Sequence, residues 1–507
     1  MTSVDNSQTN ERPQKSRRRP LRILIIVLIC FGLLSVPAFF GWKWLYTTFL
    51  EVTPPTIKVI GEIPHGIGAR PVTFRWNISD EGAGLFEAKI SLIQKGSKRD
   101  IFNGTLSVGS KKLHSKNIEV TFNAQESELN EGSVQLVIKA FDKSLWFNSA
   151  EQSYDLIVDY KKPKLAVVST QHNAVHGGSQ LIFYTATDEN LALSGVKVGD
   201  RIFNGFNASF LDLDFEQSPN LYVCIYAIDL TTEISKQTPT LFAEDRVGNV
   251  KSMNFYNKIA PIRYASLRNQ VPEQFLQKTI PDLIKKGLNK LEPLSPTLRD
   301  EDTWNDPSNS TTQKIQNFEL VNKELRRLDR EEILSQLRTG GRSEKLWQGA
   351  FVKPLGPART EFGHTLNYIY NGSNIGTVKQ LGFNFLSDAQ NGEVRTINSG
   401  IVHFTGNIGT YGNVVVIDHG LGLFSLYSNL RNYVVKLGDT VQAGQTIGTI
   451  GDSGFALTNG FTVELWVNNI PANPREWWDP TWYKAHVIDK ISAVKSALGI
   501  ASTVQQF

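Results

Sequence analysis

Residues 411–420 read Tyr-Gly-Asn-Val-Val-Val-Ile-Asp-His-Gly, a short apolar run with a glycine near each end. Similar apolar runs closed by glycine or polar turns lie at residues 400–406, 423–430, 434–441 and 461–467. Apolar runs of four to eight residues between turn residues are typical of buried strands. We therefore expect residues 350–485 to form an all-β domain with many tight turns.

Residues 436–445, Lys-Leu-Gly-Asp-Thr-Val-Gln-Ala-Gly-Gln, have the turn chemistry of a barrel-sandwich hybrid. Biotinyl and lipoyl carrier domains share such turns, but they need an exposed lysine at a hairpin tip that can be modified. No lysine lies between Lys436 and Lys484. The sequence therefore argues against a carrier domain.

The order of four motifs in this region resembles the LytM/lysostaphin-type zinc endopeptidases, which cut peptide cross-links in bacterial peptidoglycan. The motifs are residues 411–420, 426–430 (Leu-Tyr-Ser-Asn-Leu), 438–441 (Gly-Asp-Thr-Val) and 451–454 (Gly-Asp-Ser-Gly), and the similarity extends to Asn-Pro-Arg-Glu-Trp-Trp at 473–478. The resemblance implies a C-terminal LytM-type β-domain at 350–485, with a cleft that accepts an extended peptide.

The residues that such an enzyme uses for catalysis are missing here. The resemblance assigns the zinc ligands to the His and Asp of an H-x-x-x-D motif and to the second His of an H-x-H motif, and these positions hold Gln380, Asn384 and Thr462. Two further histidines that assist catalysis are replaced by Asn429 and Gly460. Catalytic zinc needs imidazole, thiolate or carboxylate ligands, which neutral amides and a hydroxyl do not replace. We predict no metal site and no catalytic residues.

Four histidines remain in this domain, His364, His403, His419 and His486. No other histidine or aspartate lies at a ligand spacing from His364. His419 ends the Asp-His-Gly strand, where we interpret it as a scaffold residue. His403 lies beside Phe404 in a strand, and we expect it on the solvent face.

Hydrogen-bonding side chains at Gln380, Asn384, Asn429 and Thr462 leave a polar cleft that either binds a peptide without cutting it or only fills space. Degenerate members of the family are known as regulators of cell-wall amidases. The sequence therefore favours an inactive LytM-type homologue that binds peptidoglycan or regulates cell-wall hydrolases. The alternatives are a zinc endopeptidase with an atypical site and a periplasmic structural spacer that binds nothing.

The N-terminus predicts a membrane anchor. The chain has 53 Lys+Arg and 49 Asp+Glu, but six of the basic and only two of the acidic residues lie within residues 1–22. An uncharged apolar run follows, and residues 23–46 are long enough to cross a bilayer. A basic flank predicts that the N-terminus stays in the cytoplasm. We expect a single-pass protein of the inner or cytoplasmic membrane with its bulk in the periplasm or outside. The charge-neutral remainder argues against nucleic-acid binding.

A weak duplication follows the anchor and predicts two immunoglobulin-like β-sandwiches, at residues 52–160 and 161–258. Alternating apolar residues indicate strands in both copies, and each copy closes strands with acidic turns, as at Asp80 and Asp142 in the first. We interpret these aspartates as turn residues that hold their own backbone, with a calcium site as the alternative. Cys224 lies in the second copy, where we expect a buried core residue rather than a disulfide or a nucleophile.

Residues 259–349 predict a partly helical linker. Apolar residues recur at steps of three to five between Ile315 and Leu337, which indicates an amphipathic helix. We interpret its charged run at 326–332 as a solvated face, with a helix that docks on a partner or covers a groove of the next domain as the alternative. The polar stretch 300–312 predicts a loop without core residues, and residues 486–507 a C-terminal tail. The expected chain is thus mainly β, with helices at the anchor and the linker.

Overall fold

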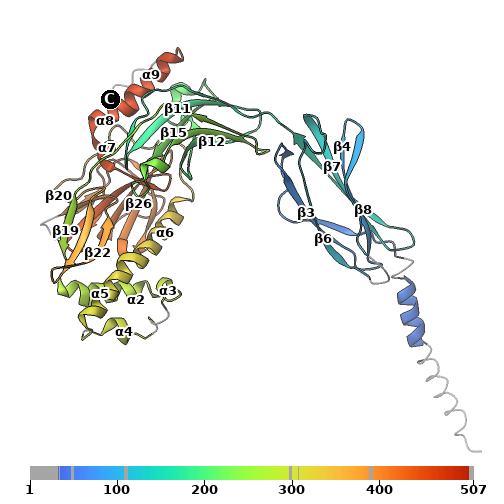
Figure 1. Ribbon diagram of the computed structural model, residues 1–507, viewed down its shortest axis with the longest axis horizontal. Coiled ribbons are helices and arrows are strands. Elements are labelled where there is room, and N and C mark those ends of the chain that lie inside the picture. Colours follow the sequence, from blue (N-terminus) through green and yellow to red (C-terminus); the bar gives the residue numbers. More distant parts are fainter. Residues whose placement is uncertain are drawn as a thin grey trace, which may run out of the picture. The chain divides into compact units, whose positions relative to one another are not determined.

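The computed structural model describes residues 32, 35–46, 51–107, 112–295, 298, 300–306, 308–386 and 392–501. The chain is mainly β, as predicted, and it divides into two compact units, residues 1–161 and 162–507 (Figure 1). We describe each unit by itself.

The predicted membrane anchor lies largely outside the described residues, as does the basic tail at 1–22. Residues 35–45 are helical, and the large side chains Phe39, Trp42 and Trp44 are exposed on this helix. Among the residues that the structure describes, no helix combines the length and the hydropathy that a membrane span requires.

Residues 51–161 form a sandwich of two sheets that enclose one core (Figure 1). The alternation of the sequence explains the core, because Phe74 and Trp76 of one sheet and Leu136 and Ile138 of the other are all buried. In sheet order the strands are β1 (Thr56–Val59), β3 (Val72–Ser79) and β6 (Ser115–Phe122), facing β2 (Gly66–Ile67), β8 (Ser149–Val158), β7 (Gly132–Asp142), β4 (Leu85–Gln94) and β5 (Ser97–Thr105).

The second unit begins with another two-sheet sandwich. One sheet has the order β14 (Phe206–Asn207), β15 (Leu221–Ala227), β11 (Ser179–Thr187) and β9 (Lys164–Val167), and the other β13 (Arg201–Asn204), β12 (Leu191–Val198), β16 (Pro239–Asp245) and β17 (Val250–Asn254). Cys224 is fully buried on β15, and burial raises the pKa of its thiol to about 12, so its interpretation as a core residue is confirmed. Short strands β10 (Ala174–Val175) and β18 (Ile259–Ala260) pair beside this sandwich.

A shared hydrophobic core joins this second sandwich to the C-terminal domain. The contact includes polar groups, because the buried carboxylate of Glu476 accepts hydrogen bonds from the backbone N–H and the hydroxyl of Ser179, at 2.7 and 3.0 Å. Trp477 Nε1 donates to the same hydroxyl at 2.9 Å. Burial raises the pKa of Glu476 to about 8, although both hydrogen bonds from Ser179 oppose the shift.

We expect Glu476 to make the second unit less stable as the pH rises. A carboxyl whose folded pKa lies above its unfolded value stabilises the fold below the unfolded pKa, and that contribution is lost as the pH rises through the folded pKa. The window for Glu476 therefore runs from its usual value to about 8. Between pH 6.5 and 8 the contribution should fall by about 1.5 kcal/mol. In Glu476→Gln, the free energy of unfolding should fall by about 1.5 kcal/mol less between pH 6.5 and 8 than in the parent, as measured by thermal unfolding at the two pH values. An equal fall in both proteins would contradict the raised pKa of Glu476.

Residues 266–337, together with residues 365–379, form a small sheet covered by helices. The sheet has the order β19 (Ser266–Gln270), β21 (Thr365–Tyr370) and β22 (Ser373–Lys379). The helices are η5 (Phe275–Thr279), α2 (Ile280–Lys286), α3 (Leu288–Leu291), α4 (Asp302–Asn305), α5 (Thr311–Leu320), η7 (Val321–Leu325) and α6 (Arg326–Leu337). The expected loop at 300–312 is wrong in part, because α4 forms there and Trp304 is buried. Its indole Nε1 donates to Leu298 O at 3.0 Å, which an isolated aromatic in a polar stretch did not indicate.

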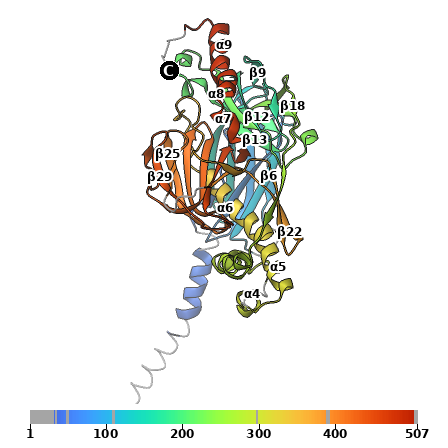
Figure 2. The ribbon, with the colours of Figure 1, turned by 90° about the vertical axis from the view of Figure 1, so that its left-hand side faces the viewer.

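Helices α5, η7 and α6 run on without a break from Thr311 to Leu337, which confirms the predicted amphipathic helix. The first half packs on the small sheet, where Phe318, Val321 and Leu325 share a core with β21. The second half packs on the large sheet of the C-terminal domain through Ile333 and Leu337. The helix is therefore part of the wall of that domain (Figure 2).

The C-terminal domain is built on one large, mainly antiparallel sheet. In sheet order its strands are β20 (Ala358–Thr360), β23 (Phe383–Leu386), β30 (Gly460–Val467), β27 (Leu423–Tyr433), β26 (Gly412–Gly420), β25 (Gly400–Ile408) and β28 (Thr440–Val441), with β24 (Glu393–Arg395), β29 (Thr446–Ile450) and β31 (Ile470–Ala472) paired at its sides. The chain ends in α7 (Pro474–Trp478), α8 (Pro480–Tyr483), η9 (Lys484–Ile488) and α9 (Asp489–Ala497). The predicted strands at 400–406, 412–420, 423–430 and 461–467 are confirmed. The expected strand at 434–441 is wrong in part, because residues 434–439 form a turn and only Thr440–Val441 belong to a strand, β28.

Candidate functional site

Three of the five sequence positions singled out above meet on neighbouring strands. Strand β23 pairs with β30 so that Asn384 lies opposite Thr462, and β27 pairs with β30 so that Ser428, next to Asn429, also lies opposite Thr462. Asn384 Nδ2 donates to Thr462 Oγ1 at 3.1 Å, and Thr462 Oγ1 donates to Asn429 Oδ1 at 3.1 Å. Asn429 Nδ2 donates in turn to Ser453 O at 2.9 Å. A continuous hydrogen-bond chain thus links the three side chains.

Gln380 lies just before β23 and lines the same cleft as the other three. Its backbone is fixed on both sides, because its N–H donates to His364 O at 2.9 Å and its carbonyl accepts from Gly363 N at 2.8 Å. The following Gly382 packs directly against β30, where a Cβ atom would lie only 2.2 Å from Val463 O. Only glycine allows this approach, which explains the glycine that separates Gln380 from Asn384.

Gly460, the fifth position, is also determined by packing. A Cβ atom at this position would lie 2.5 Å from the carbonyl oxygen of Phe385 on the neighbouring strand, where no real Cβ atom is found. Any side chain here would require the backbone of β23 or β30 to shift. The site therefore excludes an imidazole at residue 460 as it stands.

The four polar side chains open into a cleft of about 410 Å³. Other lining residues are Arg326 and Arg330 of α6, Arg359 of β20, Lys379 at the end of β22, and Glu464 of β30. Two of these come from the charged run that we interpreted as a solvated face. That interpretation is wrong for Arg326 and Arg330, since the helix borders a groove of the next domain, as the alternative stated.

Among the described residues, no histidine or cysteine lines this cleft, so the remaining histidines supply no ligand for a metal ion there. His419 is fully buried, with Nδ1 2.7 Å from Ser399 O and Nε2 2.8 Å from Ser425 Oγ, which confirms its scaffold role. The expectation of a solvent-exposed His403 is wrong. Helix α6 covers that face of β25, and His403 Nε2 lies 2.9 Å from Gln336 O.

The donor set of the cleft does not fit catalytic zinc. Asn384 presents an amide N–H₂ toward Thr462, and the Thr462 hydroxyl and the Asn429 oxygen are used in the hydrogen-bond chain. These groups carry no charge, and their lone pairs are partly engaged, whereas zinc requires anionic or imidazole ligands with one open position. What the cleft offers is hydrogen bonding and positive charge.

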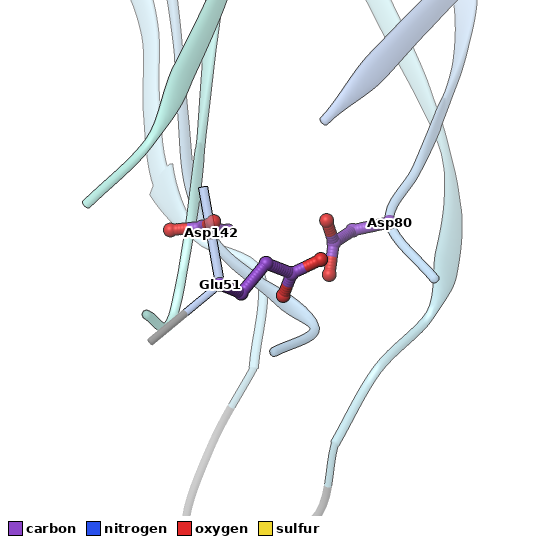
Figure 3. A group of neighbouring side chains, drawn as sticks. All are labelled: Glu51, Asp80 and Asp142. Atoms are coloured by element: carbon purple, nitrogen blue, oxygen red, sulfur yellow. The ribbon is translucent and has the colours of Figure 1, made fainter. Parts of the chain in front are cut away.

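A second polar cluster lies in the first sandwich, where Glu51, Asp80 and Asp142 bring carboxylate oxygens within 4.8 Å of one another (Figure 3). Burial raises the pKa of Asp80, and the neighbouring Glu51 and Asp142 add to the shift. Both aspartates nevertheless close their own turns, as the sequence predicted. Asp80 accepts from the backbone N–H of Gly84 at 2.6 Å, and Asp142 from that of Ser144 at 3.1 Å.

Comparison with known proteins agrees with the motifs. Residues 369–474 match Peptidase family M23. The chain is 31% identical over 140 residues to the murein hydrolase activator EnvC of Escherichia coli, which covers 28% of this chain and 31% of EnvC. It is 41% identical over 64 residues to the peptidoglycan DD-endopeptidase ShyC of Vibrio cholerae, covering 13% of this chain and 15% of ShyC.

The similarity is confined to one part of these proteins, since the chain spans less than a third of the length of either relative. Among solved structures, a mutant catalytic domain of the prophage-encoded M23 protein EnpA from Enterococcus faecalis is 26% identical, with a TM-score of 0.21, and covers 25% of this chain and 96% of that domain. The family match confirms the resemblance that the motifs indicated.

Proposed function

We propose that the M23 (LytM-type) domain formed by residues 369–474 is catalytically inactive and that the chain regulates a peptidoglycan hydrolase. The observation that carries this proposal is the hydrogen-bond chain from Asn384 through Thr462 to Asn429. It occupies the place where the resemblance puts metal ligands and a catalytic histidine. A domain that has the peptide cleft of the family but lacks the zinc ligands and catalytic histidines is suited to binding and regulation rather than to hydrolysis.

The relatives include both an enzyme and a regulator, and the longer match favours the regulator. ShyC is named an endopeptidase, whereas EnvC is named an activator of murein hydrolases, and EnvC shares the longer stretch with this chain. An activator needs a rigid surface and no catalytic metal. The buried strand β30 and the largely buried strands β26 and β27 provide a rigid sheet under the cleft.

We further propose that the two sandwiches are immunoglobulin-like modules that place this domain away from a membrane. The proposed anchor is the apolar segment at residues 23–46, with the basic residues 1–22 in the cytoplasm and the rest of the chain in the periplasm or outside the cell. In this arrangement the regulated enzyme, such as a cell-wall amidase, and the peptidoglycan are on the same side as the M23 domain.

We expect the purified chain to contain no stoichiometric zinc and to release no peptides from isolated peptidoglycan. Added to a cell-wall amidase of the source organism, it should raise the rate of peptidoglycan digestion by about tenfold or more, in the range of allosteric coupling. Metal analysis by mass spectrometry and a dye-release assay measure these results, with heat-unfolded chain as the control. Stoichiometric zinc, together with cleavage that a chelator stops, would instead identify an atypical endopeptidase. An absence of both activation and peptidoglycan binding would favour a spacer.

A further inference from the structure

Three guanidinium groups converge on the cleft from two different elements. Arg326 and Arg330 lie one turn apart on α6, and Arg359 lies on β20 at the edge of the large sheet. Lys379 adds an ammonium group at the rim. The cleft therefore gathers four positive side chains around the polar floor described above.

The guanidinium of Arg326 is buried and only partly satisfied. Its Nε and Nη2 atoms have no hydrogen-bond partner among the described residues, and its Cζ lies 4.5 Å from the centre of the Phe455 ring. Leaving charged donors buried without acceptors is costly, and a ligand that supplies acceptors removes that cost. Arg330 interacts electrostatically with the buried carboxyl of Glu464, and its Cζ lies 5.7 Å from the centre of the Trp466 ring.

The negative charge in the cleft does not balance these cations. Glu464 is the one acidic side chain among the described lining residues. One of its oxygens accepts a hydrogen bond from Trp466 Nε1 at 2.9 Å, and burial raises the pKa of this carboxyl to about 7. The positive charges of Arg330 and Arg326 oppose this rise in the pKa of Glu464 but do not cancel it. The described lining of the cleft thus sets four positive side chains against one buried carboxyl, which leaves an excess of positive charge.

A carboxylate is the anion that this arrangement fits. Planar guanidinium groups pair with carboxylates through two parallel hydrogen bonds, and the amides of Gln380 and Asn384 border the same space and suit a peptide backbone. A volume of about 410 Å³ holds the end of a short peptide and not a folded protein surface.

We propose that the cleft binds the free carboxylate of a short extended peptide, with Arg326 and Arg330 on one side and Arg359 on the other. This inference names a ligand for the cleft of the proposed function. It rests on the proposed function only in taking the cell wall as the source of the peptide. The ligand is held and not cut, because the described residues around it include one carboxyl, Glu464, and no histidine or cysteine, fewer than the three ligands that catalytic zinc needs.

The test is calorimetric titration of the purified chain with N-acetyl-Lys-D-Ala-D-Ala, once as the free acid and once as the C-terminal amide. The free acid should bind, and the amide should bind about 10- to 100-fold more weakly, since it loses charge-assisted hydrogen bonds. Affinity for the acid should also fall with added salt. Equal binding of acid and amide, or no binding of either, would overturn the proposal.

A pair of neighbouring variants supplies the matched control. Arg326→Gln should weaken binding of the acid about 10- to 100-fold. Arg327→Gln should leave it unchanged, because Arg327 is exposed and pairs with Glu324 and Glu331. Arg359→Gln, on a different element, repeats the test if Arg326→Gln fails to fold. Equal affinities in both variants and the parent would overturn the assignment.

Failure of this inference and failure of the proposed function give different results. If the peptide does not bind but the amidase is still activated, only the peptide site is wrong. If Arg326→Gln abolishes activation while the parent binds no peptide, the arginines recognise an acidic partner protein, which also overturns the peptide proposal. If the peptide binds but no amidase responds, the site stands and the regulatory role falls.

Discussion

Replacing Gln380 with His, Asn384 with Asp and Thr462 with His is expected to create a zinc site in this chain. The three positions line one cleft, and Asn384 and Thr462 are already within hydrogen-bonding distance of each other on paired strands. The triple variant would supply two imidazoles and one carboxylate, a ligand set typical of catalytic zinc. We expect an affinity in the nanomolar range, worth about 12 kcal/mol. Metal analysis after dialysis and competition with a chromogenic chelator would measure it.

The same triple variant should remain inactive on peptidoglycan. Asn429 still stands where the resemblance places a catalytic histidine, and Gly460 cannot accept a side chain without a backbone shift, because its Cβ would collide with Phe385 O. The control is the double variant Gln380→His and Asn384→Asp, which lacks the third ligand and should bind zinc at least about 100-fold more weakly. Equal zinc affinity in the double and triple variants would show that Thr462 is not a ligand position. Stoichiometric zinc in the unaltered chain would contradict the proposed inactivity.

The sequence was informative where a pattern depends on neighbours along the chain. The alternating or continuous apolar runs of residues 400–467 predicted strands, because the side-chain period of a strand is set locally. The order of the motifs placed Gln380, Asn384, Asn429 and Thr462 in one cleft, and the structure brings them together. Gly460 and Gly382 could be recognised as motif positions from the sequence. The close approach of the neighbouring strands that requires glycine at both positions could not be recognised.

Predictions failed where a residue's environment depends on an element distant in sequence. His403 alternates with buried neighbours, which predicts an exposed face, but α6 covers that face from about 65 residues upstream. A charged helical run looks the same whether water or a cleft lies beside it, so Arg326 and Arg330 gave no signal of their position. Trp304 is one aromatic residue among polar ones, and only the folded helices show that it is buried.

The attachment of α6 bears directly on function, because this helix carries two of the arginines that line the cleft. Asp329, between them, is completely buried and binds two partners outside the helix. Its carboxylate pairs with Lys290 Nζ at 2.7 Å and accepts from both the backbone N–H and the hydroxyl of Thr410, at 2.7 and 2.9 Å. The helix is therefore fixed to the turn before β26 by hydrogen bonds to a completely buried carboxylate, and to α3 by an ion pair with Lys290, whose side chain is 27% exposed.

Asp329→Ala should loosen α6 from the domain by about 3 kcal/mol, since it leaves Lys290 without its buried partner and the Thr410 N–H without an acceptor. Hydrogen exchange should report the change as a roughly 100-fold faster exchange of the amides of α6, with those of β26 little affected. Glu332→Ala is the matched control, because Glu332 also contacts Lys290 but its side chain is 37% exposed, and the expected cost is below about 1 kcal/mol. Equal exchange in the two variants would mean that hydrophobic packing of Ile333 and Leu337 alone holds the helix. If α6 instead has to detach before a partner binds, Asp329→Ala should raise activation of the amidase, whereas a helix that serves as a fixed wall predicts its loss.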